Sequence, residues 1–186
     1  MKKFIGILIF FISFNISSQD TYLQCGKIID TERGKVLNKK TIIVSSDKII
    51  AIKNGYVSSD NPLDKVIDLK SKTVMPGLID MHVHIESEFN PQKYMNAFTA
   101  NDADIAFGSL KFAEITLMAG FTTVRDLGGT GINISLRDAI AKGEVVGPRI
   151  FTAGKAIGTT GGHADPTNGW KNSLRGDPGP KEGVIN

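Results

Sequence analysis

The stretch VMPGLIDMHVH, residues 74–84, decides how the rest of the chain is interpreted. After its proline and glycine, the residues are apolar except for Asp80, His82 and His84, as in a strand that is buried on both faces. Residues two apart in a strand share a face, so the two imidazoles would project together from its carboxyl end. Enzymes with parallel sheets hold their reacting groups at this end. The stretch therefore predicts a pair of metal ligands, with Asp80 either hydrogen-bonded to a histidine ring or capping the strand.

Strand and helix patterns alternate downstream of this stretch. The predicted strands are residues 78–84, 121–126 and 149–153, and the predicted helices are residues 92–98, 102–119 and 135–142. In the longest helix, spacings of four, three and four residues align an apolar face made of Ala106, Leu110, Ala113 and Leu117. The alternation implies parallel strands joined by helical crossovers. From Gly158 onward, glycine and proline are frequent and no periodicity is visible, which predicts a long irregular loop.

Residues 20–75, upstream of the same stretch, have an all-β pattern. Short runs rich in isoleucine and valine are separated by turn signals such as Asn54-Gly55. Strands this short do not enclose a large core by themselves, so we expect them to form part of a β-sandwich. Cys25 is the single cysteine, which excludes an intramolecular disulfide, and we expect it to be a small buried residue on the first strand.

Residues 1–19 have the pattern of a secretory signal peptide. Lys2 and Lys3 precede an apolar run, residues 4–16, and small serines follow it. The run is shorter than the about 20 residues that a membrane span needs, so we predict an exported protein, periplasmic or secreted, that meets the membrane only through this peptide. The alternatives are an uncleaved anchor, a buried helix, or lipoprotein processing at Cys25.

The charge balance of the remaining chain is close to neutral. Without residues 1–19 there are 20 basic and 19 acidic residues, a net charge of +1. This balance gives no support to a nucleic-acid partner or an anionic-membrane partner.

Three motifs together resemble the metal-dependent amidohydrolase superfamily, in the branch of imidazolonepropionase-like proteins and Xaa-Pro dipeptidases. They are residues 74–84, residues 120–129 (GFTTVRDLGG), and residues 147–154 (GPRIFTAG) with the following TTGGH, residues 159–163. The resemblance implies an α/β fold: the first three βα units of a (β/α)8 TIM-type barrel over residues 76–186, preceded by part of a small β-sandwich over residues 20–75.

The resemblance also implies roles for individual residues. His82 and His84 match the first two ligands of a centre that holds one or two divalent ions, usually zinc. His163 matches a substrate-contacting residue at the mouth of the site, the alternative being a loop histidine without a role. Arg125 and Asp126 end the second strand, either as a structural ion pair beneath the site or in contact with substrate.

The chemistry implied is metal-assisted hydrolysis of a C–N bond. The ion lowers the pKa of a bound water and polarises the scissile carbonyl, and a carboxylate moves the proton to the leaving nitrogen. The implied substrates are small amides, such as Xaa-Pro dipeptides or cyclic amides, and a homo-oligomer is compatible with this class.

The length limits how much of a barrel the chain contains. A complete barrel takes about 250 residues, whereas residues 76–186 provide room for three strand–helix units. The resemblance places the other ligands, and the general acid/base aspartate, after Asn186. We therefore expect an N-terminal portion of an enzyme that is poorly stable and inactive by itself. The alternatives are a catalytically inactive product and an exported module that binds a metal or a partner.

Overall fold

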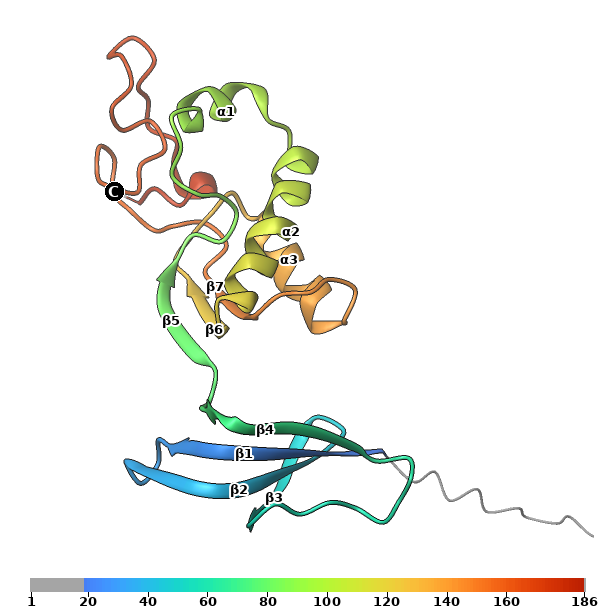
Figure 1. Ribbon diagram of the computed structural model, residues 1–186. Coiled ribbons are helices and arrows are strands. Elements are labelled where there is room, and N and C mark those ends of the chain that lie inside the picture. Colours follow the sequence, from blue (N-terminus) through green and yellow to red (C-terminus); the bar gives the residue numbers. More distant parts are fainter. Residues whose placement is uncertain (1–18, 186) are drawn as a thin grey trace, which may run out of the picture. The chain divides into compact units, whose positions relative to one another are not determined.

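The computed structural model of the protein describes residues 19–185 (Figure 1). These residues divide into two compact units, with the boundary between Pro76 and Gly77. The predicted signal peptide lies outside the described residues except for Gln19. Within residues 19–185, no helix has both the length and the hydrophobicity that crossing a membrane requires.

The first unit is a four-stranded sheet with the order β3-β2-β1-β4. Its strands are β1 (Asp20–Asp30), β2 (Lys35–Ser45), β3 (Lys48–Asn54) and β4 (Lys65–Val74). β1 pairs antiparallel with β2 and parallel with β4, and β2 pairs antiparallel with β3. Cys25, Ile28 and Ile42 form its buried cluster, and burial raises the pKa of the Cys25 thiol above its ordinary value.

β4 is one continuous strand, although its sequence contains two short β-prone runs, residues 66–69 and 72–75. Its pairing with β1 shifts register between Cys25 and Lys27. A Cβ atom at Gly26, between them, would lie 2.1 Å from the carbonyl oxygen of Lys70, so this irregularity requires glycine there. The polar Lys70-Ser71 pair that separates the two runs in the sequence therefore lies at the register shift and does not end the strand.

The second unit contains a parallel three-stranded sheet with the order β5-β6-β7. Its elements are β5 (Leu78–Val83), α1 (Lys93–Thr99), α2 (Asp102–Met118), β6 (Phe121–Asp126), α3 (Ile132–Ala141), β7 (Arg149–Thr152) and a 3-10 turn (Pro180–Glu182). α2 packs against β6 and α3, and α3 packs against β7 (Figure 1). The fold is therefore α/β with parallel strands, as the alternating pattern predicts.

The core of the second unit lies between the sheet and the helices α2 and α3. Its buried members are Ile85, Ala113, Val124, Leu136 and Ile150. The predicted apolar face of α2 is partly wrong, because Leu110 is 38% exposed and Ser109 is buried instead. A serine can occupy this position because its hydroxyl donates to the carbonyl of Ala106 at 2.7 Å.

The prediction that the first parallel strand is buried on both faces is wrong for the described residues. Leu78, Ile79 and Met81 of β5 are exposed by 41%, 60% and 54%. The physical reason is position: β5 lies at the edge of the sheet, with β6 as its neighbour. The strand ends at Val83, so His84 is the first residue after it.

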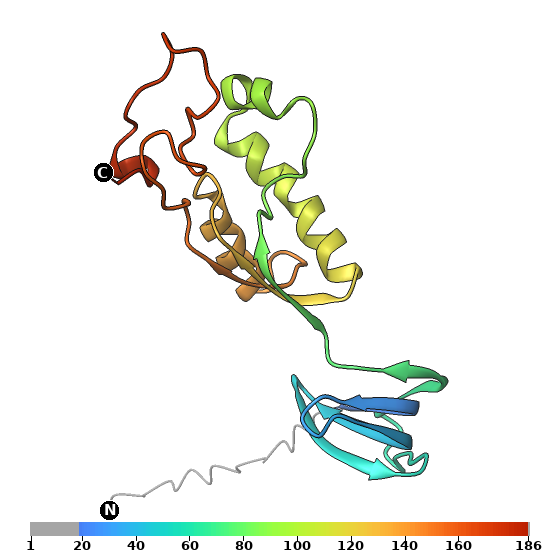
Figure 2. The same cartoon turned by 90° about the vertical axis from the view of Figure 1, so that its left-hand side faces the viewer.

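The segment after β7 is irregular, as expected, but its two ends are joined. Gly158 forms a bridge with Val184, which is buried, and the amide of Ile185 donates to the carbonyl of Gly158 at 2.8 Å. Figures 1 and 2 show this loop and α1 at the end of the sheet toward which β5 points. The ring of Trp170 in the loop contacts Phe98 of α1, with centroids 5.2 Å apart.

Candidate functional site

All three histidines of the sequence line one cavity of about 690 Å³. His82 and His84 come from the carboxyl end of β5, and His163 comes from the loop that follows β7. Gly128, after β6, and Ala153, after β7, complete the adjoining wall. The cavity therefore lies where the three parallel strands end, which is the usual position of a site in a parallel sheet.

The rings of His82 and His84 lie on the same side of the chain. Their centroids are 5.5 Å apart, and their planes are inclined at 71°. Two imidazoles on one tetrahedral ion, each with a metal–nitrogen distance of about 2 Å, place their centroids roughly 5 Å apart. The observed spacing is therefore compatible with joint binding of a single ion.

His84 has a defined tautomer. Its Nδ1 lies 2.7 Å from the carbonyl oxygen of Gly128. A carbonyl can only accept, so Nδ1 carries the proton and, in the neutral ring, Nε2 keeps its lone pair. This is the arrangement by which proteins prepare a histidine to bind a metal.

Two imidazoles are a partial ligand set. Within residues 19–185, no group of three or more His, Cys, Asp or Glu side chains is arranged to hold a metal ion. Catalytic zinc sites use three protein ligands and structural sites use four. The described residues thus fit a metal centre in the chemistry of His82 and His84, and further ligands are needed to close it.

Asp126 and Arg125 have separate partners, so the expected ion pair between them is wrong. Arg125 donates from Nε to the carbonyl of Met81 at 2.8 Å. Asp126 is 1% exposed and accepts from the amides of Ile85 and Gly128 at 3.0 and 2.8 Å. The cause is the pleat, since consecutive strand residues point to opposite faces. The contacts of Asp126 are with main-chain amides and not with Arg125.

Asp80 contacts main chain and not a ring. Its Oδ1 accepts from the amide of His82 at 3.0 Å. The carbonyl of Gly128 takes the role that a carboxylate was expected to play for the histidine ring. Asp80 and the amide that it accepts from both lie inside β5, so this contact is neither a ring contact nor a cap at the strand end.

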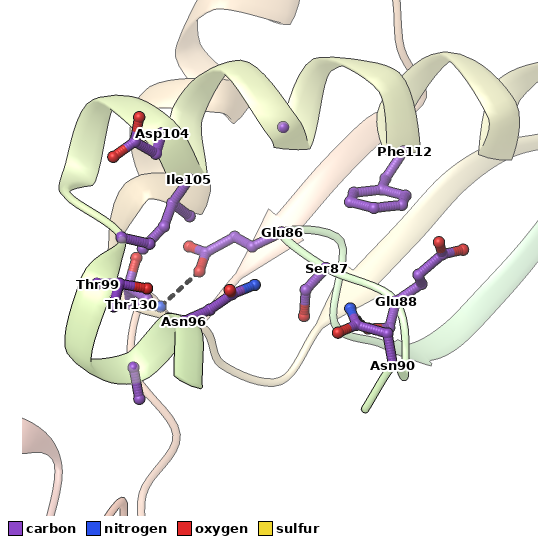
Figure 3. A pocket seen from close by; sticks show the side chains of 13 residues that line it. Glu86, Ser87, Glu88, Asn90, Asn96, Thr99, Asp104, Ile105, Phe112 and Thr130 are labelled. Atoms are coloured by element: carbon purple, nitrogen blue, oxygen red, sulfur yellow. Dashed lines mark hydrogen bonds between the residues drawn. The ribbon is translucent and has the colours of Figure 1, made fainter. Parts of the chain in front are cut away.

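Glu86 is a site residue that sequence reasoning missed. Glu86 is 8% exposed, and its carboxylate accepts from the amide of Thr130 (Figure 3) and from that of Asn133, both at 2.7 Å. The Asn133 amide belongs to the first turn of α3, where N–H groups lack helical partners and a negative charge is favoured, and Thr130 directly precedes the N-cap Gly131. A Cβ at Gly129 would lie 2.5 Å from the Glu86 carboxyl carbon. The glycine pair after β6 was the sequence signal for this close contact. No residue near that pair in the sequence indicates that Glu86 is its partner.

Glu86 also lines a second cavity, of about 560 Å³, between α1, α2 and the segment after β5 (Figure 3). Glu88, Asp104 and Phe112 contribute to its wall. The cavity contains no histidine. Glu86 therefore lines both this acidic cavity and the histidine-lined one.

His163 lies in a turn organised by Asp165. The Asp165 carboxylate, 5% exposed, accepts from the amides of Gly161 and Thr167 at 2.6 and 2.7 Å and from the Thr167 hydroxyl at 2.8 Å. These donors, the Gly161 amide first, hold the pKa of Asp165 below its usual range. The turn thus brings His163 to the same cavity as the two strand histidines.

This combination of parallel sheet, strand-end histidines and sequence motifs has a match among known families. The Amidohydrolase family matches residues 73–183, which is more than half of the chain. The protein therefore belongs to the amidohydrolase family, whose members are metal-dependent hydrolases.

Three relatives show how far the similarity extends. The chain is 43% identical to a Xaa-Pro dipeptidase crystallised with methionine in its active site, with a TM-score of 0.81 over 90% of this chain and 41% of that one. It is 40% identical to a prolidase in complex with N-methylphosphonate-L-proline, with a TM-score of 0.66 over 78% of this chain and 34% of that one. It is also 40% identical, over 65 residues, to a 5-methylthioadenosine/S-adenosylhomocysteine deaminase of Bacillus cereus, which is 35% of this chain and 15% of that enzyme. The chain spans less than half the length of each of these relatives.

Proposed function

We propose that this protein is a metal-dependent hydrolase of small-molecule C–N bonds, with Xaa-Pro dipeptides as the first substrate class and cyclic amides as the second. One observation carries the proposal: His82, His84 and His163 meet at one cavity at the carboxyl ends of parallel strands. The similarity to a Xaa-Pro dipeptidase over 90% of the chain supports the choice of substrate class.

Each residue of the site has a separate proposed role. His82 and His84 would hold a divalent ion, proposed to be zinc. When bound, this ion would polarise the scissile carbonyl and lower the pKa of a bound water. The Gly128 carbonyl keeps the proton of His84 on Nδ1 and leaves Nε2 available. His163 would contact substrate from the loop that the Asp165 turn holds in place.

We further propose that residues 76–186 begin a (β/α)8 barrel and that residues 20–75 are part of a β-sandwich. The exposed side chains of Ile79 and Met81 support the first statement, since a continued barrel would cover them, and the exposed Ile49 and Ile52 of β3 support the second. A second copy of the chain would cover the same side chains in a homo-oligomer. Light scattering coupled to gel filtration measures whether the protein is a monomer.

Export, as periplasmic or secreted protein, is proposed on the pattern of residues 1–19 alone. The mass of the mature protein tests it. A mass that lacks these residues is expected, and a protein that keeps Lys2 and Lys3 would contradict cleavage.

Metal content and hydrolysis together test the enzymatic proposal. A chain that also supplies the remaining ligands is expected to contain a divalent metal by elemental mass spectrometry and to release proline from an Xaa-Pro dipeptide, whereas residues 1–186 alone are expected to be inactive. His82→Ala is expected to weaken zinc binding at least about 10-fold, since it deletes a ligand. The matched control is His163→Ala, which should keep its metal and raise KM. A His82→Ala protein with full metal content and full activity would overturn the assignment.

Deamination is the second candidate, and the 65-residue similarity to a deaminase favours it. A deaminase releases ammonia, whereas a dipeptidase releases proline, so both products are assayed on one metal-loaded preparation. Ammonia from an amino-substituted ring without proline from a dipeptide would select deamination. Release of neither product would favour the catalytically inactive or partner-binding alternatives.

A further inference from the structure

Two hydrogen bonds connect the buried Asp126 to the ring of His84 through a single residue. Asp126 Oδ1 accepts from the amide of Gly128 at 2.8 Å, and the carbonyl of Gly128 accepts from His84 Nδ1 at 2.7 Å. Gly128 has a φ of 146°, and a Cβ there would lie 2.3 Å from the amide nitrogen of Ala156. Only glycine fits this position, and it is held at both its donor and its acceptor.

The second oxygen of the same carboxylate holds the main chain beside His84. Asp126 Oδ2 accepts from the amide of Ile85 at 3.0 Å. One carboxylate therefore fixes both the backbone that carries the imidazole and the carbonyl that receives its proton. Neither contact depends on a metal ion.

Asn133 fixes the orientation of that carboxylate from the other side. Its Nδ2 donates to Asp126 Oδ1 at 3.2 Å and to the carbonyl of Gly154 at 3.0 Å, while its Oδ1 is buried and has no partner within residues 19–185. Turning the amide over would bring its oxygen against two acceptors, so the unpartnered oxygen is the cost of donating twice. Asn133 is fully buried, and its main-chain amide donates to the carboxylate of Glu86.

We propose that Asp126 is a positioning residue that sets the tautomer and direction of the His84 imidazole through the Gly128 carbonyl, and thereby the availability of Nε2 for a metal ion. The part about the metal rests on the proposed function, whereas the part about the tautomer does not. Asp126 itself contacts neither substrate nor metal in this scheme.

Asp126→Asn is the sharpest variant because it changes one atom of a carboxylate that has three donors. An amide offers one acceptor oxygen, so its NH₂ must face the N–H of Ile85 or those of Gly128 and Asn133. The matched control is Asp165→Asn, which alters a buried carboxylate in the same unit that is not part of the Gly128 contact. Each variant is first compared with the wild type by circular dichroism.

The measurement is the tautomer of His84 in protein labelled with ¹⁵N-histidine, without metal, at about pH 8.5, where an ordinary imidazole is neutral. The signal is assigned by its absence in His84→Gln. The wild type is expected to show protonated Nδ1, Asp126→Asn a mixture of tautomers with zinc affinity about 10-fold or more weaker, and Asp165→Asn neither change. A wild-type His84 protonated at Nε2, or an Asp126→Asn protein with unchanged tautomer and affinity, overturns the proposal.

Two further results separate this proposal from the proposed function. If Asp126→Asn does not fold, the wild type alone still decides, because the proposal requires a slowly exchanging His84 Nδ1 proton with a nuclear Overhauser effect to Gly128. A wild type with the expected tautomer but no affinity for zinc supports the positioning role and refutes the metal centre.

Discussion

Among the described residues, the two units of this protein differ in their buried carboxylates, which occur in the second unit alone. In the first unit, the buried polar side chains are the neutral Gln24 and Thr41, and both hold residues 55–58 against the sheet. In the second unit, Glu86, Asp126 and Asp165 are buried carboxylates that accept from main-chain amides. A buried carboxylate is costly unless it is fully hydrogen-bonded, so its presence identifies where a fold maintains a defined geometry.

This contrast identifies the unit that specifies the site. Each of the three carboxylates lies next to a histidine: Glu86 two residues after His84, Asp126 one hydrogen-bonded residue away from it, and Asp165 two residues after His163. The first unit has no histidine, and its buried groups serve a turn. We infer that the buried carboxylates of the second unit fix the positions of groups around the histidines. The buried residues of the first unit stabilise its fold instead.

The largest expected effect comes from Glu86→Ala in the second unit. The change leaves the buried amides of Thr130 and Asn133 without their acceptor and removes a favourable charge from the start of α3. We expect the free energy of unfolding to fall by about 2–4 kcal/mol. Urea unfolding followed by the fluorescence of Trp170, the single tryptophan, reports this unit.

Glu88→Ala is the matched control for that experiment. Glu88 lies in the same segment and lines the same second cavity, but it is exposed. Its removal should change the free energy of unfolding by less than about 0.5 kcal/mol. Equal effects of the two substitutions would remove the distinction between buried and exposed carboxylates on which the comparison depends.

A smaller effect is expected from Thr41→Val in the first unit. The Thr41 hydroxyl donates to the carbonyl of Gly55 at 2.8 Å and accepts from the amide of Val57 at 2.9 Å. Valine has nearly the same shape, so the loss is that of two neutral hydrogen bonds, about 1–2 kcal/mol. Hydrogen exchange at the Val57 amide should accelerate, while the Trp170 transition should stay in place. A loss of unfolding free energy larger than that caused by Glu86→Ala would contradict the greater importance of the buried carboxylates in the second unit.

The parts of the structure that the sequence predicts are those set by neighbouring residues. Residues 121–126 form a strand at the predicted bounds, between the turn at Gly120 and the glycines that follow. The rings of His82 and His84 lie together, as their spacing of two residues predicts, although β5 itself ends at Val83. Both results follow from contacts within a few positions, for which periodicity and turn residues are direct signals.

The parts that the sequence does not predict depend on partners more than 40 positions away. α3 begins at Ile132 and not at the predicted Ser135, because Glu86 satisfies amides that a local serine would otherwise cap. The partner of the His84 ring is a carbonyl at Gly128, and a carbonyl has no signature in a sequence. Hydrophobic patterning likewise predicts that β5 is buried, whereas several of its side chains are exposed. The reason is that a pattern does not show how many strands flank a given strand.

The smallest and most local effect concerns acid and the turn that holds His163. The pKa of Asp165 is lowered in the folded protein, chiefly by the amide of Gly161, so the folded state favours the carboxylate form. The stabilising contribution is therefore present above the ordinary carboxyl pKa, about 3.9, and is lost as the pH falls through the lower folded value. Hydrogen exchange at the Gly161 and Thr167 amides should show increased opening of the turn at low pH, beyond the intrinsic change measured in the unfolded chain. Asp165→Asn should open the turn at neutral pH and abolish this dependence. A dependence that survives in Asp165→Asn would mean that another group holds the turn, and the link between buried carboxylates and the histidines would then apply to His84 alone.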